Sequence, residues 1–250
     1  MKLSAKHLLI LSGLLLSCGR LAFCQLPDYT ARLFDERFGI RGEIQWVTID
    51  QTDFVWLATS NRIFRFDGKQ TREFTFKERI RSLECDMHNQ IWTNTSSGVY
   101  IFKNDYEGFK PVVSNTSGET DFGNVFVLPG KELYLHTNKD LLQWNSSELS
   151  FHNLDIHKWG LPQEWDVPKV SGFGKTVFLS SKDSMYAVDI EQHTYLSIPR
   201  INNQGGMYAI SDHEIIVTGR SNISSWCNFE TGLIQPINPK NNIDPRLTEF

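Results

Sequence analysis

Short apolar stretches alternate with polar turns along most of the chain, and the alternation recurs at a nearly constant interval. Residues 50–66 predict a turn, a strand, a second turn and a second strand. Residues 86–102 repeat this pattern with the same spacing, which places a Trp six residues after an Asp and a Phe ten residues after the Trp. The two copies are 36 residues apart. A regular period of about 40 residues is typical of repeat architectures.

Three fainter copies follow, with other residues at the two aromatic positions. The Trp position is occupied there by Tyr134, Phe178 and Ile216. The position ten residues later is occupied by Trp144, Val188 and Trp226. Successive copies are separated by 36, 42, 44 and 38 residues. The sequence therefore predicts five repeat units, at residues 43–78, 79–120, 121–165, 166–204 and 205–240.

Each unit predicts four short strands. The first strands are expected at residues 44–49, 80–85, 125–128, 170–171 and 207–210. The second strands, such as residues 55–58, are apolar on both faces. Both faces of a propeller blade are buried between its neighbours, whereas a strand of a two-sheet sandwich alternates apolar and polar residues. We therefore predict an all-β fold, a β-propeller built from four-stranded blades.

The sequence leaves the number of blades open. Propellers usually contain about four to eight blades, so the five units could close a ring or belong to an incomplete seven-bladed propeller. Residues 25–42 are interpreted as an N-terminal lead-in strand region, in which residues 33–38 could complete another blade. Because no capping strand is visible near residue 250, we expect an incomplete propeller within a longer polypeptide.

Residues 1–24 have the pattern of a targeting segment. Two lysines precede an apolar run at residues 8–16, and small residues precede Gln25. This pattern predicts a secretory signal peptide that is cleaved before Gln25, with an apolar core too short for a membrane span. In the alternative interpretation, Cys18 carries the lipid of a lipoprotein. Either way the protein is expected to be exported, to the periplasm or the outer surface, and no membrane span is expected after the signal peptide.

Composition and charge narrow the classes of partner. The chain is 40% apolar with a net charge of −4, which is typical of a core-forming protein and gives no reason to expect nucleic acid as a partner. Outside the targeting segment the cysteines are Cys85 and Cys227. They fall in the second and fifth units and on different strands, so we predict two unpaired buried thiols rather than a disulfide.

The common catalytic and cofactor motifs are missing from the sequence. It contains no metalloprotease, serine-hydrolase, phosphate-loop or paired-cysteine signature. His152 and His157, with Asp155 between them, would need a further ligand to hold a metal ion and are interpreted as loop residues. We therefore predict no catalytic residues, no cofactor and no metal site, and we expect this chain not to be an enzyme.

Trp159 and Trp165 are the candidate ligand-binding residues. They lie in a loop with Gly and Pro that lengthens the step between the third and fourth units. An aromatic face can stack on a sugar ring or on a partner protein. The alternative is that the two rings fill a gap between blades. The sequence does not decide between these interpretations.

At the two clear units the residues resemble the two-component-regulator propeller repeat. The repeat-defining residues are Asp50, Trp56, Thr59 and Phe66 in the first unit, and Asp86, Trp92, Thr95, Gly98 and Phe102 in the second. The first unit departs from the pattern at Arg62, where the family has Gly. Proteins of this family use such repeats as the periplasmic sensor of hybrid histidine kinases and related regulators, commonly in carbohydrate sensing.

The resemblance implies a ligand-sensing or recognition module. Its partners would be a carbohydrate or another small ligand, and a signalling protein or a further C-terminal signalling region. Two alternatives stay open: a propeller enzyme that acts on glycans, or a structural scaffold for protein interactions. The enzyme would need acidic residues that converge from several blades, and the sequence offers scattered ones: Asp53, Asp183 and Glu214.

Overall fold

A computed structural model describes residues 38–114, 121–128, 133–165, 171–201, 204–219 and 224–237. The predicted signal peptide, Cys18 and most of the predicted lead-in lie outside these residues. The described part of the lead-in, residues 38–42, is turn and coil, so it contains no strand. In the described residues no helix is long and apolar enough to cross a membrane.

Twenty strands form five antiparallel sheets of four strands each in the part of the chain that the structure describes. The first two sheets contain β1 (Trp46–Ile49), β2 (Val55–Ala58), β3 (Arg62–Phe66), β4 (Thr71–Thr75), β5 (Ser82–Cys85), β6 (Ile91–Asn94), β7 (Gly98–Asn104) and β8 (Gly108–Ser114). The third and fourth contain β9 (Phe122–Val127), β10 (Leu133–Thr137), β11 (Leu141–Asn145), β12 (Ser150–Asn153), β13 (Ser171–Phe173), β14 (Thr176–Ser180), β15 (Ser184–Asp189) and β16 (Thr194–Pro199). The fifth contains β17 (Gln204–Ala209), β18 (Glu214–Gly219), β19 (Ser224–Asn228) and β20 (Leu233–Ile237).

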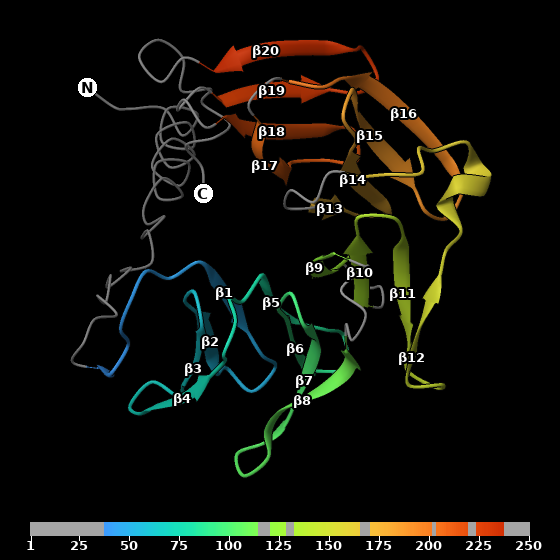
Figure 1. Ribbon diagram of the computed structural model, residues 1–250. Helices are drawn as coiled ribbons and strands as arrows, with labels where there is room; N and C mark the ends of the chain where they lie inside the picture. The colour runs from blue at the N-terminus through green and yellow to red at the C-terminus, as the bar shows by residue number, and fades with distance from the viewer. Residues whose placement is uncertain are drawn as a thin grey trace, which may run out of the picture. The chain divides into compact units, whose positions relative to one another are not determined.

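The sheets are consecutive blades. Within each sheet the strands pair in chain order, and consecutive sheets contact one another through their first strands, β1, β5, β9, β13 and β17. Figure 1 shows these first strands on the inner side of the sheets and the fourth strands on the outer side. The predicted β-propeller fold with four-stranded blades is therefore confirmed.

Two of the first strands begin two residues later than the sequence predicted. β1 begins at Trp46 rather than at residue 44, and β5 begins at Ser82 rather than at residue 80. The apolar residue Ile80 is buried, but its backbone N–H donates to Ser60 O (2.7 Å) in the turn of the preceding blade. Ile80 thus packs in the junction between the first two blades without belonging to the ladder.

An Asp–Trp hydrogen bond explains the six-residue spacing of the clear repeats. In the first blade, Trp56 Nε1 donates to Asp50 Oδ2 (2.8 Å), while Asp50 Oδ1 accepts from the backbone N–H groups of Thr52 and Phe54 (2.9 and 3.1 Å). Asp53 closes the turn with φ +65°. Burial opposes ionisation of Asp50, but the hydrogen bonds from Thr52 and Trp56 outweigh it and hold the pKa of this carboxyl below its usual value.

The second blade repeats this arrangement. Trp92 Nε1 donates to Asp86 Oδ2 (2.8 Å), and Asp86 Oδ1 accepts from the backbone N–H groups of His88 and Gln90 (2.9 and 2.8 Å). In the last three blades the Asp position holds Leu128, Gly172 and Ile210, and none of the residues at their Trp position carries an indole N–H. The two partners have been lost together, because either one alone would leave a buried polar group without a partner.

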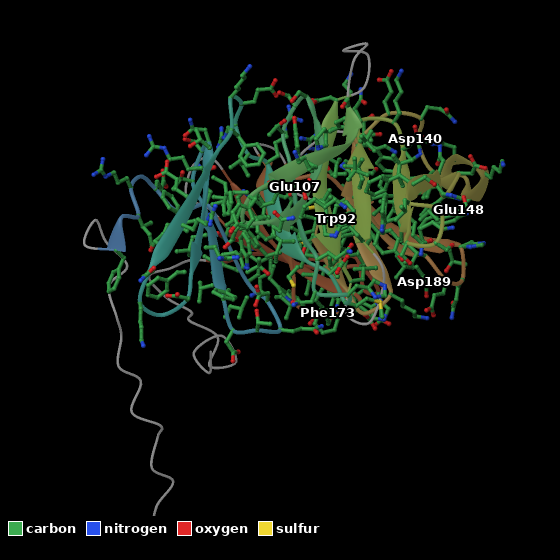
Figure 2. All side chains as sticks on the ribbon, turned by 90° about the horizontal axis from the view of Figure 1, so that it is seen from below. Trp92, Glu107, Asp140, Glu148, Phe173 and Asp189 are labelled. Carbon is green, nitrogen blue, oxygen red and sulfur yellow. The ribbon has the colours of Figure 1, made fainter. Side chains whose placement is uncertain are left out.

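Apolar clusters fill the four junctions between the consecutive described blades. The Trp position of each of the first four blades packs toward the next blade. Trp56 lies in the first junction with Leu83, and Trp92 lies in the second with Leu133. Trp92 is fully buried within the packed side chains (Figure 2). Burying an aromatic side chain contributes about 2–3 kcal/mol, so these residues hold neighbouring blades together.

The remaining repeat residues have local roles. Thr59 and Thr95 start the turn after the second strand, and their backbone N–H groups donate to Arg62 O and Gly98 O (both 2.9 Å). Phe66 is buried, and Phe102 packs edge-on against Trp56 with 4.9 Å between ring centroids. The thiols of Cys85, which is half-buried, and Cys227, which is buried, are both free.

Candidate ligand-binding pocket

A polar pocket of about 730 Å³ lies where the chain enters the inner strands of the first three blades. This volume is within the range of small-molecule sites, about 300–1,000 Å³. Its walls come from residues 43–46 before and in β1, residues 79–81 before β5, and residues 121–124 around the start of β9. Residues 43–46 lead into β1, and the other two segments lead from the outer strand of one blade to the inner strand of the next, so blade packing brings the three together.

Arg81 and Asp121 form the wall between the second and third blades. Arg81 Nη1 lies 2.5 Å from Asp121 Oδ1, and the same nitrogen donates to the backbone oxygen of Phe122. The backbone N–H of Arg81 donates to Asn94 O (2.8 Å). The two charges compensate each other, so this pair positions the wall and leaves little charge to attract a ligand.

A buried polar network lies beneath this wall. Asn94 Nδ2 donates to Gly123 O (2.6 Å), the hydroxyl of Ser82 donates to Asn94 Oδ1, and Val125 N–H donates to the Ser82 hydroxyl (3.0 Å). Ser82 and Asn94 are fully buried. Satisfied buried networks of this kind hold backbone segments in one arrangement. The floor of the pocket is therefore fixed across the junction of the second and third blades.

The opposite side of the pocket presents available polar groups. Arg79 is exposed, and its Nη2 makes a long 3.4 Å hydrogen bond to Gln45 Oε1. No carboxylate of the described residues lies within ion-pair distance of Arg79. Glu43, also exposed, and Asn124 add further polar groups, and Trp46 adds a half-buried aromatic ring. Donors, acceptors and one aromatic surface in an open pocket suit a small polar ligand.

The structure places the two predicted ligand-binding tryptophans outside this pocket. Trp165 is only 4% exposed and lies in the apolar cluster between the third and fourth blades. Its ring meets Tyr186 edge-on at 5.6 Å, and its backbone N–H donates to Asn138 O (2.9 Å). Trp165 therefore fills the gap between blades, which is the second of the two predicted alternatives, and a ligand could not stack on its ring.

Trp159 also has protein neighbours. It ends the short 3₁₀ helix η2 (Ile156–Trp159), is half-buried, and stacks on His193 with 4.4 Å between ring centroids and 12° between planes. One face of this ring is thus covered. Neither tryptophan lines the polar pocket, so the loop that carries them and the pocket are separate features.

The other sequence candidates do not converge either. Asp53 lies in the turn between β1 and β2, whereas Asp183 lies in the turn between β14 and β15, which is at the opposite end of its blade. His152 Nε2 contacts Glu148 Oε2 (2.7 Å), while His157 lies near Asp140 (3.7 Å). Among the described residues no group of three or more His, Cys, Asp or Glu side chains could hold a metal ion.

A histidine and a glutamate outside the pocket have pKa values that burial shifts toward the neutral form. His136 on β10 is fully buried, neither ring nitrogen has a hydrogen-bond partner, and burial lowers the pKa of its imidazole to about 4. Glu84 on β5 is half-buried, and burial raises the pKa of its carboxyl to about 8. His136 is therefore neutral at pH 7, and burial favours the neutral form of Glu84. Sequence reasoning found neither, because burial of a single polar residue in an apolar strand leaves no spacing signal.

Comparisons with known proteins agree with the propeller fold. No family model matches the chain, and no curated protein matches it. The extracellular domain of the hybrid two-component system BT3049 from B. thetaiotaomicron matches with a TM-score of 0.61 at 14% identity, over 82% of this chain and 31% of that chain. The extracellular domain of the one-component system BT4673 from the same organism matches with a TM-score of 0.52 at 13% identity, over 78% and 28%.

An enzyme shares the same fold. Virginiamycin B lyase from Staphylococcus aureus matches with a TM-score of 0.60 at 10% identity, over 81% of this chain and 71% of the enzyme. The chain spans about a third of the BT3049 chain. At these identities the likeness establishes the fold alone, and the proteins that share it include the extracellular domains of a two-component system and of a one-component system.

Proposed function

We propose that this protein is an exported ligand-sensing or recognition β-propeller, comparable to the extracytoplasmic sensor part of a two-component regulator. The observation that carries the proposal is the polar pocket at the entry to the inner strands, with its open polar side chains and with Arg79, which has no ion-pair partner among the described residues. The resemblance of the first two repeats to regulator propellers supports it, as does the fold shared with the extracellular domains of a two-component system and a one-component system.

The ligand of this pocket is a small polar molecule, and a carbohydrate fragment suits it best. Arg79 and Gln45 would hydrogen-bond to hydroxyl or carboxylate oxygens, and Asn124 offers both a donor and an acceptor. The ring of Trp46 provides an apolar surface for the C–H face of a sugar. Ligand binding would be transmitted to a signalling partner or to a further C-terminal signalling region. In this proposal the chain itself performs no catalysis.

The alternative of a glycan-acting enzyme is less well supported. Its only specific support is the shared fold with a lyase. The two carboxylates of the pocket are Glu43, which is exposed, and Asp121, which is paired with Arg81. A glycosidase needs two carboxyl groups on either side of the bond that it cleaves, one of them free to act as an acid.

Titration calorimetry tests the proposal. The exported mature protein is titrated with a panel of neutral and acidic oligosaccharides, and at least one is expected to bind. Arg79→Ala and Asn124→Ala should each weaken that binding by about tenfold, since each removes one or two hydrogen bonds to the ligand. Lys110→Ala, on the outer strand β8, is the matched control and should leave affinity unchanged. Binding that is insensitive to both pocket variants would contradict the proposal.

A further inference from the structure

A second pocket, of about 400 Å³, lies at the outer side of the first two blades and shares no lining residue with the first. It is formed by the end of β4, the residues that follow it, and the facing parts of β7 and β8. Four aromatic residues line it, all half-buried: Phe74, Phe76, Tyr100 and Phe109. Half-buried rings at a pocket wall keep part of their surface available to a ligand.

The rings meet at steep angles. Phe76 and Tyr100 are 5.4 Å apart at 81°, Phe76 and Phe109 are 5.4 Å apart at 60°, and Phe74 and Phe109 are 5.6 Å apart at 82°. Rings at such angles form the adjoining walls of a box rather than a layered stack. The face of an aromatic ring is electron-rich, so a box of rings attracts a cation.

Two carboxylates stand at the rim of this box. Glu78 Oε2 accepts a hydrogen bond from the Ser97 backbone N–H (2.9 Å) and another from the Ser96 hydroxyl. The Ser96 bond is the main cause that lowers the pKa of Glu78, so this carboxyl is ionised at neutral pH. Glu107, in the turn between β7 and β8, accepts from Asn104 Nδ2 (2.8 Å) (Figure 2).

Two lysines partly offset this negative charge. Lys110 Nζ lies 4.0 Å from Glu107 Oε2, at the outer limit of an ion pair. Lys77 lines the pocket, is exposed, and has no carboxylate within ion-pair distance among the described residues. Neither ammonium group contacts an aromatic ring of the box in the described cation contacts. The guanidinium carbon of Arg72 does lie 5.8 Å from the ring centroid of Phe74, so a cation of the protein already contacts that ring. None of the described cation contacts involves Phe76, Tyr100 or Phe109.

The neighbouring residues show that this chain already uses the same chemistry internally. The guanidinium carbon of Arg65 lies 4.6 Å from the ring centroid of Phe54 and 5.9 Å from that of Phe102. The same guanidinium pairs with Asp105, at 2.7 Å between Nη1 and Oδ1. In that arrangement a cation is held by aromatic faces and one carboxylate. The second pocket has aromatic rings and a carboxylate of the same kind, and no cation of the described residues contacts the rings of Phe76, Tyr100 or Phe109.

We propose that this aromatic pocket binds a small organic cation, a quaternary or primary ammonium group, between Phe76, Tyr100 and Phe109 and beside the carboxylate of Glu78. This site is independent of the polar pocket and of the function proposed for it. A compact ammonium group on a short carbon chain fits a volume of about 400 Å³ with room to spare.

Choline and its neutral carbon isostere, 3,3-dimethyl-1-butanol, test the proposal, because they have the same shape and differ in charge. Binding to the mature protein is followed by NMR titration. We expect choline to bind with a Kd on the order of millimolar, and the isostere to bind at least about tenfold more weakly. Equal binding of the two, or no binding of choline, would overturn the proposal.

Variants locate the site. Phe76→Leu, which keeps an apolar side chain but removes the ring, should weaken choline binding by about tenfold. Glu78→Gln should weaken it by about threefold or more, and Lys77→Ala should strengthen it, because a competing positive charge is removed. Lys182→Ala, at an exposed position in the turn between β14 and β15, is the control and should have no effect. If Phe76→Leu fails to fold, Glu78→Gln and Lys77→Ala still test the location of the site. Unchanged choline affinity in both variants would contradict the proposed location.

Discussion

A single hydrogen bond between Asp and Trp side chains accounts for much of the regularity of the clear repeats at the scale of residues. Trp56 and Trp92 each donate to a carboxylate oxygen at 2.8 Å, and the other oxygen of each carboxylate holds two backbone N–H groups of the preceding turn. One Asp therefore fixes both the turn and the rotamer of the ring that fills the junction between blades. Loss of this Asp would leave the indole N–H and the backbone N–H groups buried without a hydrogen-bond partner, which lowers the stability of the fold.

Replacing Asp86 by Asn tests the Asp–Trp hydrogen bond. The amide keeps one oxygen for the backbone N–H groups of His88 and Gln90 but directs an NH₂ group at Trp92 Nε1–H. We expect a loss of about 2 kcal/mol in the free energy of unfolding, measured with urea. In the Trp92→Phe background the same change should cost less by at least about 1 kcal/mol. Strictly additive effects would contradict the coupling. Asp67→Asn, in an exposed turn without an indole, is the control.

Burial of His136 predicts a loss of stability in acid. The pKa of its imidazole is about 4 in the folded protein, below the 6.5 of an exposed histidine. The unfolded chain therefore binds the proton first, so the stabilisation is full above pH 6.5 and is lost as the pH falls toward 4. The loss amounts to about 3 kcal/mol.

The variant His136→Leu should abolish this part of the pH dependence. It should also be about as stable as the original at pH 7, because a buried polar group without a partner is replaced by an apolar one. Unfolding by urea between pH 4 and 7 measures both effects. An unchanged profile in His136→Leu would contradict the assignment of the proton to His136.

At the scale of elements, the spacing of apolar residues predicted the strands well, while the pocket could not be predicted. Strand order follows from the repeat, because four short apolar segments per unit have few other ways to pair. The pocket depends on Gln45, which lies just before β1, and on Arg79 and Asp121, which lie in the connections that lead to β5 and β9. Their adjacency is a property of blade packing, and no local spacing encodes it. The role of Trp165 could not be predicted from the sequence for a related reason. A ring that fills a gap between blades and a ring that stacks on a ligand need the same residue type.

The departure of the first repeat at Arg62 also has a structural explanation. In the second blade the pairing of β7 with β8 shifts register between Val99 and Tyr100, and a Cβ built on Gly98 would lie 2.3 Å from Val113 O. The corresponding pair in the first blade, β3 and β4, has no such shift, and Arg62 pairs there with Thr75. Glycine is required only where the irregular pairing brings the neighbouring backbone close.

Gly98→Ala should therefore destabilise the protein by about 2 kcal/mol or more, because the obstructing atom is backbone and cannot move aside cheaply. Gly206→Ala is the matched control within a strand. The nearest atom to its added Cβ would be 3.4 Å away in the side chain of Tyr208. That variant should change the midpoint of thermal unfolding by only a few degrees at most. Equal effects of the two substitutions would contradict the account of Gly98.

At the scale of the whole molecule, successive blades are joined by apolar junctions, and the polar groups that could recognise a ligand gather at the entry to the inner strands. The Asn94 network and the Arg81–Asp121 pair tie the second blade to the third at this point. A ligand in the polar pocket would contact segments from three blades at once. Binding there would affect the packing of two blade junctions. A sensing module needs such an effect if ligand binding is to be transmitted to a partner.

Hydrogen exchange, followed by mass spectrometry, is the most direct test of ligand sensing through the polar pocket. The mature protein is compared with and without each oligosaccharide of the panel. The proposal predicts that a binding member slows exchange of backbone amides in residues 43–46, 79–81 and 121–124 together, and leaves residues 156–165 unchanged. Protection confined to the loop that carries Trp159, or no protection by any member of the panel, would contradict the account.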